Sequence, residues 1–288
     1  MRSKLLPFVI TLILFIFPFF WLKPGFMDLG GDSSRLYFYD PLRYLLNYSL
    51  FAVSPSGVGS ENIGFMTIPF VAFLAVAKRI FVSSTVLISA FHGLSVSMSF
   101  LFVYLSIVQL LYTATKGERL KEFAAVAGGL LYVFSPVSIF GWDKVLMTHN
   151  HVFLNPIMFY LLLRFMVSDR LYYLFCALLL TFVFSANFSF AAAPVFFAFY
   201  PITLVLLLMY KQWVLGQNIR WKQIGVACII FILLQAFHIV PQIASMVTPG
   251  SVLYTSVFSA AGKYDRGLGY FSAIAPSIKA SINVLMLP

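Results

Sequence analysis

The chain of 288 residues is 61% hydrophobic and only 10% charged, and its mean hydropathy is +0.94. Soluble globular domains carry about 25% charged residues, so this composition excludes an ordinary soluble protein and indicates an all-α polytopic membrane protein. The net charge of +10 does not indicate a nucleic-acid partner, because no run of lysine and arginine interleaved with stacking aromatic residues is present.

The first predicted element is an apolar helix that follows the basic start of the chain. Arg2 and Lys4 precede the stretch Leu5–Leu22 as in a signal peptide, but no small-residue cleavage site follows, so we expect an uncleaved helix. A bilayer crossing needs about 20 apolar residues. Six further stretches approach or exceed that length: Ser83–Tyr112, Phe123–Phe140, Val152–Met166, Leu171–Ser189, Ala191–Tyr210 and Ile224–Met246. The sequence therefore predicts about seven transmembrane helices.

One further apolar segment, Ile63–Ala77, either crosses the membrane or lies flat at its surface. It contains Pro69 and is followed by Lys78 and Arg79. If it lies flat, the basic loops after the second, fourth and sixth apolar stretches fall on the same side as the N-terminus. Because basic loops prefer the cytoplasmic side, we expect a flat segment and a cytoplasmic N-terminus in a multi-pass protein of the plasma membrane. Eight spans are the alternative.

In this topology, residues 23–82 form a long first external loop, and residues 247–288 begin a late external loop. The first loop is longer than a simple linker requires. It contains two stretches that predict interfacial helices: Tyr39–Phe51, in which Pro41 suits a first helical turn, and Ile63–Ala77. No internal repeat is evident, so we expect residues 1–288 to form a single membrane domain.

Asp32 is the first candidate for a catalytic residue. It lies in the polar island Gly30–Arg35, just beyond the first apolar stretch, although only 9 of the 288 residues are acidic. A carboxylate beside a membrane span in so apolar a chain typically binds or reacts with something. Asp32 could act as a general base towards an acceptor hydroxyl. A helix N-cap explains the same Asp-Ser pattern, so both interpretations stay open.

Asp40, Arg35 and Arg43 are candidates for substrate or phosphate binding. Asp40 directly precedes Pro41, which is typical of a helix start, so capping is the stronger interpretation of Asp40. Arg43 could bind a phosphate, as could Arg35, or form an exposed salt bridge with Asp40. His238 lies near the outer end of the last apolar stretch and could face a cavity, although a hydrogen-bonded interior histidine is the ordinary role.

The second external loop, residues 141–151, contains Asp143, His149 and His151. These are ligand types for a divalent cation such as Mg²⁺ or Mn²⁺. A His-x-His pair with one distant carboxylate is a weak signal, because histidines also suit membrane interfaces. The sequence has no phosphate-binding loop, no dinucleotide fingerprint and no HExxH or GxSxG motif. No predicted span carries an acidic residue or a lysine near its midpoint, which disfavours an ion-coupled transporter.

The layout and several short motifs resemble the conserved module of GT-C glycosyltransferases. One span is followed by a long external loop with an early aspartate and two surface helices, then by six further spans and another external loop. Gly31-Asp32, Tyr39–Leu46 and Ile68–Phe70 are similar to the first-loop pattern of mycobacterial arabinofuranosyltransferases and related bacterial or archaeal members. Ser135-Pro136 is similar to the Ser-Pro that recurs in that family at the outer end of the third span.

The resemblance implies transfer of a sugar from a polyprenyl-phosphate donor to a glycan, lipid or protein acceptor at the external face of the membrane. Asp32 would match the catalytic carboxylate of the first loop, and Asp143 an acidic position of metal-dependent members. The chain departs from the pattern because its first loop has no Asp-x-Asp or Glu-x-Asp pair. It is also short for this family, so we expect residues 1–288 to be a fragment or core of a longer protein. The alternative is a non-enzymatic membrane protein: a transporter subunit, a lipid flippase or a scaffold.

Overall fold

The computed structural model describes residues 5–21, 36–50, 67–81, 83–111, 118–136, 138–139, 151–184 and 194–247. Within these ranges the secondary structure is helical and contains no strand. The predicted all-α class is therefore confirmed for the part of the chain that the structure describes.

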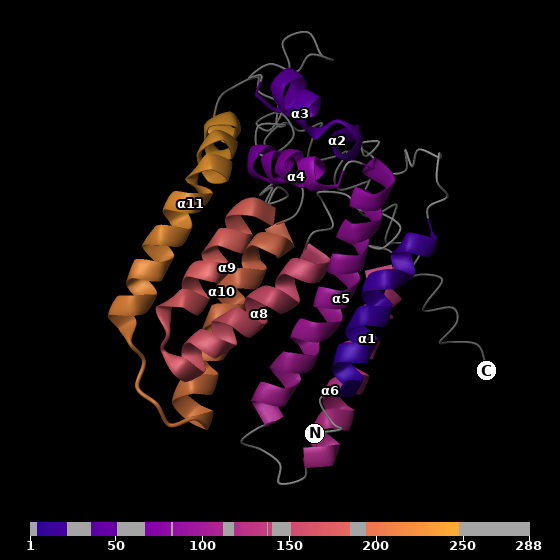
Figure 1. Cartoon of the computed structure of the whole chain (residues 1–288). Coiled ribbons are helices and arrows are strands. Elements are labelled where there is room, and N and C mark those ends of the chain that lie inside the picture. The colour runs from indigo at the N-terminus through magenta and orange to yellow at the C-terminus, as the bar shows by residue number, and fades with distance from the viewer. Residues whose placement is uncertain are drawn as a thin grey trace, which may run out of the picture.

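The long helices run side by side as a bundle, and each overlaps one of the seven predicted apolar stretches (Figure 1). They are α1 (Leu5–Ile16, extended by the tighter turn Phe17–Phe20), α5 (Ser84–Leu111), α6 (Glu118–Val133), α8 (His151–Ser168), α9 (Leu171–Phe184), α10 (Pro194–Met209) and α11 (Trp221–Val247). The prediction for α6 was wrong at both ends, because this helix runs from Glu118 to Val133 rather than from Phe123 to Phe140. Hydropathy marks only the apolar part of a helix, and the charged first turn of α6 falls outside that part.

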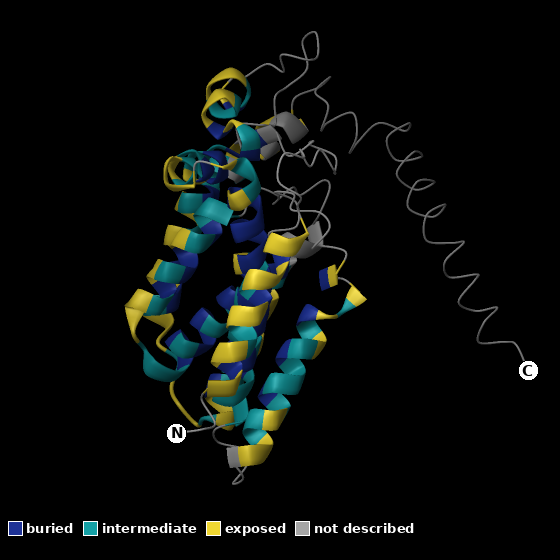
Figure 2. Ribbon diagram, turned by 45° about the vertical axis from the view of Figure 1, so that its right-hand side comes forward, coloured by how far each residue is buried: buried dark blue, intermediate teal, exposed yellow. Residues whose placement is uncertain are grey.

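Helix α5 alone, among the described helices, is both long enough and apolar enough to cross a bilayer by those two criteria. Shorter apolar helices occur at Leu5–Phe20, Val152–Ser168, Leu171–Phe184, Phe199–Val214 and Trp221–Phe237. The outward faces of the bundle are nevertheless rich in large apolar side chains, including Phe8, Phe123 and Leu233. In Figure 2 the exposed positions run along the outward faces of the helices, and buried positions lie between the helices.

Three shorter helices, called the platform below, lie across one end of the bundle (Figure 1). They are α2 (Leu36–Tyr39), α3 (Pro41–Tyr44, extended by the wider turn Leu45–Ser49) and α4 (Ile68–Ile80). The helix predicted over Tyr39–Phe51 begins at Pro41 instead, with Asp40 as its N-cap, and Tyr39 ends the separate helix α2, which the sequence did not predict. Asp40 has φ −139° and ψ 75°, outside the helical region, and Pro41 after it has no N–H to donate.

An aromatic cluster joins the platform to the bundle. Phe70 of α4 contacts Phe91 of α5 and Phe184 of α9, with ring centroids 5.6 and 5.9 Å apart. Phe153 of α8 contacts the same two rings at 5.8 and 5.4 Å, and Phe38 of α2 contacts Phe91 at 5.5 Å. Buried aromatic pairs contribute about 0.5–1.5 kcal/mol each beyond the burial of their area. The platform rings therefore contact two helices of the bundle, α5 and α9, and Phe153 brings α8 into the same cluster.

The opposite end of the bundle, called the basic end below, is where α5 and α8 end and where α6, α9 and α11 begin. Seven of the ten described lysines and arginines lie there: Arg119, Lys121, Arg164, Arg170, Lys211, Arg220 and Lys222. The other three, Arg43, Lys78 and Arg79, belong to the platform. The N-terminus of α1 also lies at the basic end in Figure 1.

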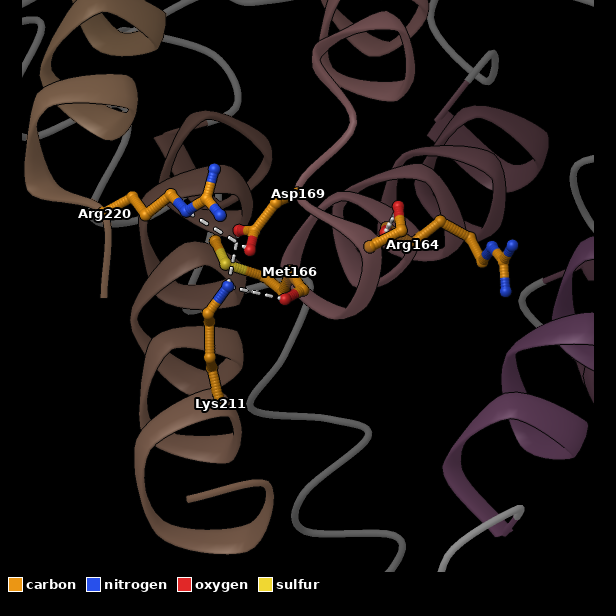
Figure 3. A network of polar contacts seen from close by, with 6 residues as sticks. Arg164, Met166, Asp169, Lys211 and Arg220 are labelled. Atoms are coloured by element: carbon orange, nitrogen blue, oxygen red, sulfur yellow. Dashed lines mark hydrogen bonds and ion pairs between the residues drawn. The ribbon is translucent and has the colours of Figure 1, made fainter. Parts of the chain in front are cut away.

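At the basic end, an ion pair joins the connection between α8 and α9 to the connection between α10 and α11 (Figure 3). These two helical hairpins are α8–α9 and α10–α11. The Nζ of Lys211, after α10, donates to Asp169 Oδ1 at 2.7 Å and to the carbonyl oxygen of Met166 at 2.8 Å. The Lys211 side chain is only 3% exposed, and that of Asp169 is 26% exposed. Arg220 lies 3.4 Å from the other carboxylate oxygen. Because Asp169 follows α8 and Lys211 follows α10, this pair fixes the two connections side by side.

Helices α1 and α5 approach closely at Gly93. A Cβ added at this glycine would clash with the backbone carbonyl oxygen of Phe15 in α1. We expect Gly93→Ala to lower the free energy of unfolding by about 1–3 kcal/mol, because a backbone atom cannot rotate aside. Chemical unfolding in detergent micelles measures the change.

Gly225 in α11 provides a matched control, because a Cβ there meets no atom within 4 Å. Gly225→Ala is expected to leave the free energy of unfolding unchanged or to raise it by up to about 1 kcal/mol. Equal destabilisation by the two substitutions would contradict a specific contact between α1 and α5 at Gly93.

Candidate functional site

The candidate site lies on the platform, where the described part of the first loop brings polar side chains together. Asp40 caps α3: its carboxylate oxygen Oδ1 accepts a hydrogen bond of 3.0 Å from the backbone N–H of Arg43. The capping interpretation of Asp40 is therefore confirmed. Asp40 is also exposed, and its contact with a substrate stays a prediction.

The guanidinium of Arg43 is exposed and forms no ion pair within the described residues. The salt bridge with Asp40 that the sequence allowed is not formed, and Asp40 Oδ1 accepts a hydrogen bond from the backbone N–H of Arg43. An exposed arginine without a carboxylate partner is suited to binding a phosphate, which accepts two parallel hydrogen bonds from one guanidinium.

Lys78 near the end of α4 is a further cation at this site. Its Nζ donates to Ser84 Oγ at 2.5 Å, and Ser84 Oγ lies 3.4 Å from the carbonyl oxygen of Tyr39. Burial lowers the pKa of Lys78 below its usual value, and the nearby Asp40 partly opposes this shift. These contacts hold the ammonium between α2, α4 and α5, close to the capping carboxylate.

The remaining polar groups of the platform stabilise its fold and are not candidates for acid–base catalysis. Ser49 and Thr67 share a buried hydrogen bond of 3.1 Å, which joins the end of the wider turn after α3 to the start of α4. Burial, followed by the proximity of Tyr48 and Tyr37, raises the pKa of Tyr44 above its usual value. Tyr44 is therefore neutral at physiological pH and is not a candidate base.

Most of the remaining predicted site residues fall outside the part of the chain that the structure describes. Asp32, Arg35, Asp143 and His149 lie in the undescribed ranges 22–35 and 140–150. The backbones of His151 and His238 belong to α8 and α11, but the positions of their side chains are not described. The structure therefore brings together Asp40 and Arg43 from the predicted set.

The divalent-cation site also stays a prediction. No group of three histidine, cysteine, aspartate or glutamate side chains is close enough to hold a metal ion among the described residues. Two of the three predicted ligands, Asp143 and His149, are not among those residues. A third predicted ligand, His151, is the first residue of α8.

A separate cavity of about 240 Å³ lies between α8, α9, α10 and α11. Its lining is almost entirely apolar and includes Leu162, Leu178, Leu204 and Phe231. Such a cavity suits a hydrocarbon chain, and the titratable side chains in its lining are Tyr200 and Cys228. The platform therefore carries the candidate site.

Sequence reasoning did not identify Lys78 as a site residue. It treated Lys78 and Arg79 only as the polar end of an apolar segment. The signal that could have identified it was a lysine in the last turn of an amphipathic helix, within the same predicted loop as Asp32 and Asp40.

No protein-family model, curated protein or solved structure matches this chain.

Proposed function

We propose that the protein is a membrane glycosyltransferase that moves a sugar from a polyprenyl-phosphate donor to an acceptor at the external face. The observation that carries this proposal is the platform, which lies across the end of the bundle opposite the basic end. In sequence, Asp32 precedes the first residue of α2 by four positions, so the proposed base belongs to the chain segment that leads into the platform.

The distribution of charge supports the membrane orientation on which this proposal depends. Seven described cations lie at the basic end and three lie on the platform. Because basic loops prefer the cytoplasm, this asymmetry favours an external platform and a cytoplasmic N-terminus. The large apolar side chains on the outward faces of the helices favour contact with lipid, because so much exposed apolar surface is unusual for a protein in water.

In the proposed reaction, the carboxylate of Asp32 accepts the proton of an acceptor hydroxyl. The hydroxyl oxygen attacks the anomeric carbon of the sugar, and the bond from that carbon to the phosphate oxygen breaks. The electron pair of the broken bond leaves with polyprenyl phosphate, and the anomeric configuration is inverted. Arg43, Lys78 and Arg35 are the cations available to stabilise the charge on the departing phosphate.

The direct test is turnover of polyprenyl-phosphate sugars by the purified protein in nanodiscs, with and without Mg²⁺ or Mn²⁺. Release of polyprenyl phosphate that requires an acceptor is the expected result. Activity restored by a divalent ion after chelation would assign a role to the predicted metal ligands Asp143, His149 and His151. Failure of every lipid-linked sugar to react, with a correctly folded protein, would contradict the proposal.

The orientation can be tested separately by labelling single cysteines. In a variant whose native Cys176 and Cys228 are replaced by alanine, Arg79→Cys at the platform is expected to react with a membrane-impermeant maleimide in intact cells. Gln217→Cys at the basic end is expected to react only after the membrane is permeabilised. The reverse pattern would place the platform in the cytoplasm and would contradict the proposed sugar transfer at the external face.

The apolar cavity between α8 and α11 favours a second candidate, a protein that handles lipid without chemistry. Its lining is almost entirely apolar and suits a hydrocarbon chain. A flippase of this kind would move a lipid between leaflets without breaking a glycosidic phosphate bond. Turnover of a lipid-linked sugar distinguishes the two candidates.

A further inference from the structure

Arg164 in the last two turns of α8 is held by neutral partners from two neighbouring helices. Its Nη1 donates to Oε1 of Gln109 in α5 at 2.7 Å. Its Nε and Nη2 donate to the hydroxyl of Tyr173 in α9 at 3.3 and 3.1 Å. Figure 3 shows the guanidinium pointing away from Asp169, the carboxylate in the nearby turn. The guanidinium is therefore oriented by contacts that leave its charge unpaired.

The charge of Arg164 is not balanced by a carboxylate within the described residues. Asp169 follows Arg164 by five positions and binds Lys211 and Arg220 instead. An arginine has five N–H donors, and the contacts with Gln109 and Tyr173 use three of them. Two donors and a full positive charge remain for an anionic group, in an orientation that needs little rearrangement.

A pair of tyrosines and a second arginine adjoin this guanidinium. The rings of Tyr172 and Tyr173 lie 3.9 Å apart between centroids, and the guanidinium carbon of Arg164 lies 5.4 Å from the centre of the Tyr173 ring. Arg170 precedes both tyrosines in the turn between α8 and α9, is exposed, and interacts electrostatically with each of them. Two cations therefore flank an aromatic pair at the basic end.

This cluster lies near the ends of its helices, the position at which membrane helices meet the head-group region. Arg164 lies four residues before the last residue of α8, or about 6 Å along the helix axis. Tyrosine and arginine side chains near the ends of apolar helices are typical of the membrane interface. Anionic lipids are enriched in the cytoplasmic leaflet, where we expect the basic end to lie.

We propose that Arg164, Arg170 and Tyr173 form a binding site for the phosphate of an anionic phospholipid in the cytoplasmic leaflet. The inference rests on the membrane location proposed above but not on sugar transfer, because the platform lies at the other end of the bundle. Arg164 supplies the two remaining donors, and Arg170 adds a second charge. Tyr173 and Gln109 hold the guanidinium from two sides and so fix its orientation.

The test is native mass spectrometry of the delipidated full chain, titrated with phosphatidylglycerol, with phosphatidylcholine of the same acyl chains, or with inorganic phosphate. The wild-type protein is expected to bind phosphatidylglycerol more tightly than phosphatidylcholine. Arg164→Gln is expected to weaken binding of phosphatidylglycerol about tenfold, which is typical for loss of a charge-assisted hydrogen bond. Arg170→Gln, at an exposed position that should not affect folding, is expected to weaken it less.

Lys222→Gln is the matched control, because it removes one exposed positive charge from the basic end on another helix. It is expected to leave the binding of phosphatidylglycerol unchanged. Equal binding of the two lipids, or an equal loss in Lys222→Gln and Arg164→Gln, would overturn the proposal. Displacement of phosphatidylglycerol by inorganic phosphate at the same concentration would assign the site to a soluble anion and overturn the lipid assignment.

Discussion

Asp169→Asn is expected to lower the free energy of unfolding by about 3–5 kcal/mol, the usual cost of removing one partner from a buried ion pair. Lys211 is only 3% exposed, so its ammonium would keep its charge in a buried position after the loss of its carboxylate partner. Asn keeps the backbone change small, because Asp169 has φ 54° and asparagine tolerates the left-handed conformation as well as aspartate does. Chemical unfolding in detergent micelles measures the loss.

Two further variants separate the ion pair from the fold around it. The double variant Asp169→Asn with Lys211→Met is expected to recover part of the loss, because it removes the buried unpaired charge. Arg220→Gln is expected to cost less than about 1 kcal/mol, because the Arg220 side chain is 58% exposed. An Asp169→Asn protein as stable as the wild type would show that the pair does not hold the two hairpins together.

Asp32→Asn is expected to reduce sugar transfer by about 100-fold or more, which is the range for loss of a general base. This substitution distinguishes the two interpretations of Asp32, because asparagine caps a helix as well as aspartate does. A residue that only caps a helix would therefore retain both activity and stability as asparagine. The measurement is the initial rate of polyprenyl phosphate release in nanodiscs.

Asp28→Asn is the matched control, because Asp28 is a second carboxylate in the same loop with no proposed role. It is expected to retain the wild-type rate. The thermal unfolding temperature of each variant shows whether a loss of transfer reflects chemistry or folding. Full activity of Asp32→Asn would refute its role as base, and an equal loss in Asp28→Asn would indicate a general effect of loop charge.

The sequence alone predicted the class of fold and the positions of the long helices. Hydropathy is a local property, so each apolar stretch could be located without knowledge of its neighbours. The cap at Asp40 was also predictable, because the Asp-Pro pair acts within one helical turn. The short helix α2 before this cap was not predicted, because a single turn over Leu36–Tyr39 is too short to show a helical period in the sequence.

Only the tertiary structure decided which side chains meet. Lys211 binds Asp169 across 42 positions of sequence, and Arg164 binds Gln109 across 55. No local pattern encodes such pairs, because they depend on how whole helices pack. The same holds for α4, whose composition fits a crossing or a flat helix, and whose position across the bundle end follows from the aromatic contacts of Phe70. Hydropathy thus determined where the long helices lie in the sequence. Packing between distant helices determined how the platform sits on the bundle and which charged side chains meet.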